Sequence, residues 1–169
     1  MRFFSRPEMS VLMVCSANIC RSPMAEGVMR FELLQLGLQN KVQVDSAGTH
    51  ASQAGRAPDP RAQRVCSQNG IDIRKARARQ VSQKDFETFN HILAMDARNY
   101  EWLIGACPEP HKHKISLVGH WAGHSSEVEI PDPYYGNEQG FAHVLSLLQT
   151  AIAGFVAREF SSLPASAGK

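Results

Sequence analysis

Short apolar runs alternate with longer amphipathic stretches along this chain, which predicts alternating strands and helices. Apolar runs bounded by polar residues predict strands at about 9–15, 42–44, 91–95 and 114–118. Helical periodicity and helix start and stop signals predict helices at about 22–36, 59–68, 97–105 and 138–160. Strands that alternate with helices in this way favour an α/β sandwich around a parallel sheet.

The chain has 169 residues, a length that suits one domain with a sizeable core. We predict an N-terminal extension at 1–8, a single domain at 9–160 and a flexible C-terminal tail at 161–169. A loop rich in Gly, His and Pro is expected at 119–137, and loops of this length usually have a function.

Composition narrows the function classes. The net charge of +2 gives no electrostatic reason to expect nucleic-acid binding. The basic run at 74–79 predicts a solvated loop or helix end, with contact to an acidic partner or a phosphopeptide flank as the alternative. The N-terminus lacks the apolar region of a secretory signal, and no run approaches the ~20 apolar residues of a membrane span. Four cysteines without metal-binding or disulfide spacing favour a reducing cytoplasm.

The strongest chemical signal lies at residues 11–23. An apolar run ends at Cys15, a short loop follows, and Ser22-Pro23 predicts a helix start with Ser22 as its N-cap. Such a strand–loop–helix turn directs backbone N–H groups at one point and binds an oxyanion there. It favours the thiolate form of Cys15, and the planar fork of Arg21 can hold two phosphate oxygens. The predicted chemistry is attack of Cys15 on phosphorus, followed by hydrolysis of a cysteinyl-phosphate; the alternative is a core cysteine and an unrelated surface arginine.

A second candidate group lies in the long loop. Prolines on both sides of Asp132 restrict its backbone, and a carboxylic acid held in this way can protonate a leaving phenolate. Tyr134 and Tyr135 could form an apolar wall for an aryl group. The alternative is a turn with an Asp side-chain cap and two packing tyrosines.

Cys15-Ser16-Ala17-Asn18-Ile19-Cys20-Arg21-Ser22-Pro23, together with Asp132-Pro133-Tyr134-Tyr135-Gly136, resembles the low-molecular-weight protein tyrosine phosphatase family. Segments at 44–49, 58–59 and 95–96 also match, so the resemblance covers about residues 9–160. It implies a three-layer α/β sandwich with a four-stranded parallel sheet flanked by helices on both faces. It also implies hydrolysis of phosphotyrosine on a protein substrate in two steps, without metal or cofactor.

The resemblance assigns roles by position. Cys15 is the expected nucleophile, Arg21 the transition-state clamp, and Asp132 the general acid and then the base. Ser22 is expected to hydrogen-bond the thiolate, and Cys20 to form a protective disulfide with Cys15. The remaining expected site residues are loop members Ser16, Ala17, Asn18 and Ile19, the Asn18 partner Ser46, and the pocket residues Ser52, Tyr134 and Tyr135.

The chain departs from the family pattern in two places. Ser52 stands where many members have an aromatic residue, so one wall of the substrate slot is expected to be missing. Ala76 aligns with a histidine that supports the loop serine, so we expect weaker support for Ser22.

Other function classes fit less well. An arsenate reductase needs a close second cysteine pair, but Cys66 and Cys107 are far apart and Asp132 would have no role. A thiol oxidoreductase would use Cys15 and Cys20, which are not a Cys-x-x-C pair. A binding module would not need the full set of chemical groups. A metal hydrolase would rely on loop histidines, His111, His113, His120 and His124. We expect no metal, no nucleic acid and no membrane contact, and a monomer or weak dimer.

Overall fold

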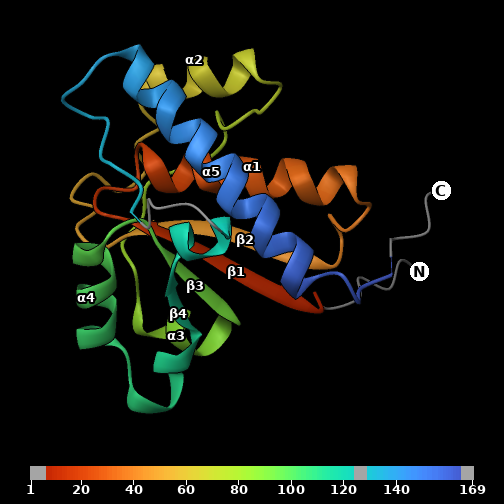
Figure 1. Cartoon of the computed structure of the whole chain (residues 1–169). Helices are drawn as coiled ribbons and strands as arrows, with labels where there is room; N and C mark the ends of the chain where they lie inside the picture. Colours follow the sequence, from red (N-terminus) through yellow and green to blue (C-terminus); the bar gives the residue numbers. More distant parts are fainter. Residues whose placement is uncertain (1–6, 124–128, 165–169) are drawn as a thin grey trace, which may run out of the picture.

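The computed structural model describes residues 7–123 and 129–164, which form an α/β sandwich (Figure 1). Four parallel strands lie in the order β2-β1-β3-β4, with bounds Met9–Cys15 (β1), Val42–Gly48 (β2), His91–Ala94 (β3) and Ile115–Leu117 (β4). One face is covered by α1 (Arg21–Gln35), α2 (Pro60–Gln68) and α5 (Glu138–Glu159), and the other by α3 (Gln83–Thr88) and α4 (Ala97–Ala106). Short 3-10 helices lie at Glu109–Lys114 (η1) and Val118–Ala122 (η2). The predicted four-stranded parallel sheet with helices on both faces is confirmed.

The central strand β1 explains why its sequence is continuously apolar. Val11 and Met13 pack into the core under α1 and α5, whereas Leu12 and Val14 pack into the core on the α3 and α4 side. All four side chains have 0% exposure. Because helices cover both faces of a parallel sheet, both sets of alternating side chains must be apolar.

Helix α5 is long and apolar enough to cross a membrane by length and hydropathy alone. The expectation that no run approaches such a span is therefore wrong on composition. Its apolar stripe is buried in the core that it shares with α1 and α2, so its hydrophobicity serves packing. The buried residues of α5 are Phe141, Val144, Leu145, Leu148, Ala151, Ile152, Phe155 and Val156.

Three local features differ from the sequence prediction. Strand β2 continues to Gly48, beyond the strand predicted at 42–44, because it pairs in register with β1 up to Cys15↔Gly48. Helix α3 was not predicted, although Ser82 and Asp85 form a capping box at its start. Helix η2 occupies the beginning of the predicted loop 119–137.

The predicted extension and tail are partly described. The Glu8 N–H donates to the Lys41 carbonyl (2.8 Å), and Leu163 packs against the core. Residues 1–6, 124–128 and 165–169 lie outside the described residues.

Candidate active site

The carboxyl ends of the central strands bring the predicted site residues to one edge of the sheet. Cys15 is the last residue of β1, and its register partner Gly48 ends β2. The loop that carries Asp132 reaches the same edge because the Ile130 N–H donates to the Met95 carbonyl after β3 (2.8 Å). Ligands of open parallel sheets bind at this edge.

The loop from Cys15 to Arg21 turns tightly between β1 and α1. Asn18 has a φ of 57°, and it is the one non-glycine residue with positive φ in the described ranges. Helix α1 starts at Arg21 with Cys20 as its N-cap, and no side chain caps it. The prediction that Ser22 is the cap is therefore wrong, because Ser22 lies inside the first turn. A helix start without a side-chain cap can offer its N–H groups to an oxyanion.

The Ser22 hydroxyl lies inside the loop, 3.0 Å from the sulfur of Cys15. The Asn18 amide Nδ2 donates to Ser22 Oγ (2.8 Å), so Ser22 keeps its own proton to donate elsewhere. The two acceptors within reach are the Cys15 sulfur and, at 3.4 Å, the Ala47 carbonyl. Ser22 can therefore donate a hydrogen bond to a thiolate at Cys15.

A hydrogen-bond network fixes Asn18. Its Nδ2 also donates to Ser46 Oγ (3.0 Å), and Ser46 donates to Glu26 Oε2 (2.7 Å). Its Oδ1 accepts from the Arg79 backbone N–H (2.9 Å), so both ends of the amide are committed. The network contains no histidine, and Ala76 takes no part in it. The Glu26 carboxylate accepts from Ser46, and Asn18 donates to both Ser46 and Ser22, so these contacts hold Ser22 although Ala76 replaces the supporting histidine of other family members.

Arg21 is 2% exposed, and its guanidinium is held in place by neighbouring acceptors. Its Nη1 donates to Asp96 Oδ2 (2.6 Å) and to the Ile130 carbonyl (3.0 Å), and its Nη2 lies 3.4 Å from Asp132 Oδ2. Burial opposes the charge, but the Cys15 thiolate, Asp96 and Asp132 outweigh burial and raise the pKa of Arg21. The contact of Asp96 with Arg21 was not predicted from the sequence; Asp96 is also the N-cap of α4, where its Oδ1 accepts from the Asn99 N–H (2.8 Å).

Asp132 stands at the rim of the pocket with 51% of its side chain exposed. Its Oδ1 accepts from the Tyr134 N–H (3.1 Å), as in an Asx turn, while Oδ2 faces Arg21. The carboxyl group can therefore reach both the interior of the pocket and solvent, as a group that protonates a leaving group and later activates water must.

Arg61 of α2 connects the loop that carries Asp132 to the loop from Cys15 to Arg21. It donates to the carbonyls of Tyr134 (2.9 Å) and Gly136 (3.1 Å). The Asp59 carboxylate holds Arg61 at 2.9 Å, and the Asp59 N–H donates to the Ile19 carbonyl (2.8 Å). This chain of contacts links the two halves of the site through α2.

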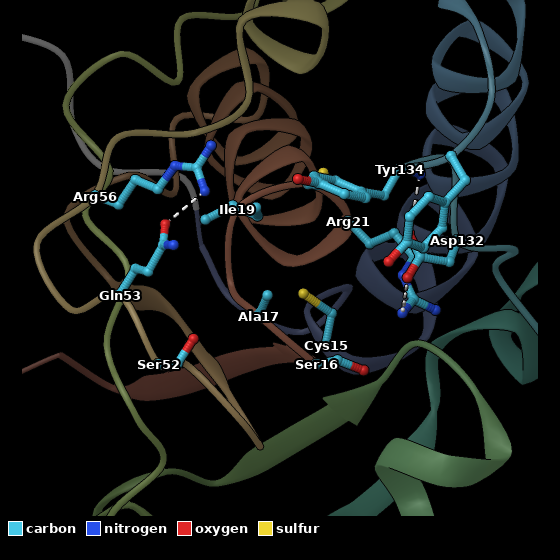
Figure 2. A pocket seen from close by; sticks show the side chains of 12 residues that line it. Cys15, Ser16, Ala17, Ile19, Arg21, Ser52, Gln53, Arg56, Asp132 and Tyr134 are labelled. Carbon is cyan, nitrogen blue, oxygen red and sulfur yellow. Dashed lines mark hydrogen bonds and ion pairs between the residues drawn. The ribbon is translucent and has the colours of Figure 1, made fainter.

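The mouth of the pocket has two unlike sides (Figure 2). Asp132 and Tyr134 lie on one side of the Cys15 thiol, and Ser52, Gln53 and Arg56 lie on the other. Tyr135 is 95% exposed, and its ring meets that of Tyr134 edge to face at 5.0 Å between centroids. The full lining is Cys15, Ser16, Ala17, Ile19, Cys20, Arg21, Ser52, Gln53, Arg56, Asp132, Tyr134 and Tyr135.

Cys20 shares the pocket with Cys15, and both are free thiols. Burial, together with the charges of Asp59 and Cys15, raises the pKa of Cys20 to about 12. Cys20 is therefore a protonated thiol at neutral pH.

Two residues that support the site, Gly48 and Asn99, were not identified from the sequence. A side chain at Gly48 would meet the Ser16 carbonyl at 2.5 Å, so only glycine allows β2 to approach the loop so closely. Asn99 of α4 donates to Ser16 Oγ (3.1 Å) from a buried position. A Ser-Ala-Gly-Thr segment at a strand end was the one available hint of Gly48.

The histidines that the structure describes do not form a metal site. In residues 7–123 and 129–164 no group of three or more His, Cys, Asp or Glu side chains could hold a metal ion. His111 and His113 belong to η1 and His120 to η2, whereas His124 lies outside the described residues.

The chain is similar over almost its whole length to known phosphatases. The family model described as low molecular weight phosphotyrosine protein phosphatase matches residues 10–163. A protein of that description from Schizosaccharomyces pombe is 42% identical over 132 residues, which cover 78% of this chain and 84% of the relative. One from Homo sapiens is 39% identical over 141 residues, 80% of this chain and 85% of the relative.

A solved structure agrees with this similarity. A protein tyrosine phosphatase from Entamoeba histolytica, crystallised with Hepes in its active site, superposes with a TM-score of 0.86 at 38% identity. The match covers 89% of this chain and 96% of that structure.

Proposed function

Because the chain belongs to the low molecular weight phosphotyrosine protein phosphatase family, we propose that Cys15, Arg21 and Asp132 carry its phosphatase reaction. The activity itself, hydrolysis of phosphotyrosine through a cysteinyl-phosphate, follows from membership of the family. The observation that supports the residue assignment is their convergence: all three line one pocket at the end of β1, although Asp132 is 111 positions from Arg21.

In the first step the Cys15 thiolate attacks phosphorus, so that an S–P bond forms and the P–O bond to the phenol breaks. The electrons of that bond go to the leaving oxygen, which takes a proton from the Asp132 carboxyl group. Arg21 and the loop N–H groups hold the equatorial phosphate oxygens, where negative charge is spread in the transition state. Asp96 and the Ile130 carbonyl use Nη1 of Arg21, so that Nε and Nη2, the latter 3.4 Å from Asp132 Oδ2, are the groups that can contact phosphate.

In the second step water attacks the cysteinyl-phosphate, and the Asp132 carboxylate takes its proton. The S–P bond breaks, and its electrons return to Cys15 as a thiolate. The Ser22 hydroxyl lies 3.0 Å from this sulfur and has its proton free to stabilise it as it leaves. Asn18 and Ser46 act behind the pocket by fixing the direction of that hydroxyl.

The finer properties of the enzyme are also proposals. The substrate is a phosphotyrosine-containing protein, and the reaction needs no cofactor. Cys15 and Cys20 form a reversible disulfide under oxidation, because both thiols line one tight loop. A reactive thiol of this kind suits the reducing cytoplasm, and we propose a monomer or weak dimer there, without nucleic-acid or membrane partners.

The test is hydrolysis of aryl phosphates by the wild type, Cys15→Ser and Asp132→Ala, with a chelator present. Cys15→Ser should lose turnover and still bind phosphate. Asp132→Ala should slow poor leaving groups by ~10²–10⁴-fold and acidic phenols less, because they need less protonation. Substantial activity in Cys15→Ser, or an equal loss across the leaving-group series in Asp132→Ala, would contradict the assignment.

A further inference from the structure

Arg56 lines the pocket mouth and forms no ion pair with an acidic side chain of residues 7–123 or 129–164. Its guanidinium contacts the Gln53 side-chain carbonyl (2.5 Å), and in the described part of the chain no carboxylate oxygen lies within 4.0 Å of it. Arg21, the other arginine of the lining, contacts Asp96 and Asp132. Arg56 is therefore a positive charge at the pocket rim without an ion-pair partner among the described residues, although it acts at longer range on Asp59 and helps Arg61 to lower the pKa of that carboxyl group.

The backbone of the basic run 74–79 fixes the position of Arg56. The Ala78 N–H donates to the Arg56 carbonyl (2.9 Å), and the Gly55 N–H donates to the Ala78 carbonyl (2.7 Å). Gly55 has a φ of +84°, which favours glycine in this turn. Backbone hydrogen bonds to Ala78 thus hold the loop that carries Arg56 in place.

Two of the four basic side chains in the run 74–79 form ion pairs with acidic residues of the protein. Arg74 pairs with Asp72, and Arg79 pairs with both Asp45 and Asp85. No residue of this run lines the pocket, so the run supports the pocket through its backbone, and the basic side chain on this side of the mouth is Arg56.

The opposite side of the mouth carries the other sign. Asp132 stands there beside the tyrosines, so the charge across the mouth is asymmetric (Figure 2). Ser52 is small and leaves its side of the pocket open towards Gln53 and Arg56. A peptide whose phosphotyrosine enters between these sides must pass its neighbouring residues over one of them.

We propose that Arg56 selects phosphotyrosine substrates that carry an acidic residue next to the phosphotyrosine, by pairing with that carboxylate. The proposal rests on the proposed function and names its substrate class. An exposed ion pair of this type changes a binding constant by about 2- to 5-fold, and salt should weaken it. A guanidinium that instead stacked on the phosphotyrosine ring would act on every aryl substrate alike.

The experiment compares kcat/KM for matched phosphopeptides with Glu, Gln or Lys next to the phosphotyrosine, on either side. The wild type should prefer Glu over Gln by about 2- to 5-fold at low salt, and less at high salt. Arg56→Gln should abolish this ratio, and Arg56→Glu should reverse it in favour of Lys. Arg64→Gln is the matched control: Arg64 is exposed, pairs with Glu138 and does not line this pocket, so its ratio should equal that of the wild type.

Two results would overturn the proposal. One is a wild type that does not discriminate at either flanking position. The other is an Arg56→Gln variant that loses the same factor on all peptides and on an aryl phosphate, which would assign the guanidinium to the ring. Failure of the proposed function is distinguishable, because the wild type would then not hydrolyse the aryl phosphate at all.

Discussion

The guanidinium of Arg61 donates to the backbone carbonyl of Tyr134 at 2.9 Å, two residues beyond Asp132. The same guanidinium lies over the Tyr134 ring, 5.6 Å from its centroid, and is anchored by Asp59. Arg61 therefore fixes the loop that carries Asp132, the proposed general acid, relative to the loop from Cys15 to Arg21. Arg61 does not line the pocket, so we expect it to act on the reaction through Asp132 and not by contact with phosphate.

We predict that Arg61→Ala lowers kcat by about 10-fold on poor leaving groups and far less on good ones, because a displaced acid fails where protonation matters. Arg61→Lys should not restore the rate, since one ammonium cannot replace the planar fork that reaches two carbonyls. The measurement is kcat across a series of phenol leaving groups. Arg64→Ala on the same helix is the control, and a loss independent of the leaving group would show a merely structural role.

Ser22→Ala should slow the second step more than the first. Removal of a hydrogen bond to a charged group costs about 1.5–3 kcal/mol, which corresponds to a loss in kcat of roughly 10- to 100-fold. Rapid-mixing experiments should then show a burst of phenol release as the cysteinyl-phosphate accumulates. Ser46→Ala keeps the contact between Asn18 and Ser22 and should lose less. The absence of a burst in Ser22→Ala would remove this role.

Peroxide should inactivate the enzyme, and dithiothreitol should restore it. The Cys15 thiolate becomes a sulfenic acid as peroxide is reduced, and the Cys20 sulfur then displaces water from it to form a disulfide. The Cys15 charge that helps to raise the pKa of Cys20 is lost in the first of these steps, which helps Cys20 to react. Mass spectrometry should show the Cys15–Cys20 link. Recovery that is as complete in Cys20→Ala as in the wild type would contradict a protective disulfide; Cys107→Ala is the control.

Stability should fall at alkaline pH through Cys66, which is fully buried in the main core. Burial raises the pKa of Cys66 from 9.0 to about 12. An acid with a raised folded-state pKa stabilises below its unfolded pKa, and this contribution is lost as pH rises towards the folded value. The loss should reach about 2 kcal/mol between about pH 8.5 and about pH 10.5.

In Cys66→Ala the cavity lowers the free energy of unfolding by an amount that does not depend on pH, and the variant has no thiol at this position to titrate. The difference in unfolding free energy between wild type and Cys66→Ala, measured in urea at several pH values, should therefore shrink as pH rises. Parallel curves over this range would show that Cys66 does not carry the effect.

The sequence alone determined the chemical centre, because the parts of that centre are adjacent in the chain. An apolar run, Cys15, a five-residue loop and Arg21 specify a strand, a turn and a helix start through local pattern and backbone preference. The same locality predicted the sheet and most helices. It misplaced the helix cap at Ser22 by two residues, since the position of the first helical turn depends on how the whole loop closes.

Only the tertiary structure decided how that centre is held and what surrounds it. Asp96 reaches Arg21 across 75 positions, and Arg61 reaches Tyr134 across 73. Arg56 reads in the sequence as one of many basic residues, and its place at the pocket mouth follows from backbone bonds to Ala78. Such contacts leave no periodic signal, because they depend on which strand ends and loops meet at one sheet edge. That meeting is fixed by burial of both faces of the sheet, a property of the whole chain and not of any one segment.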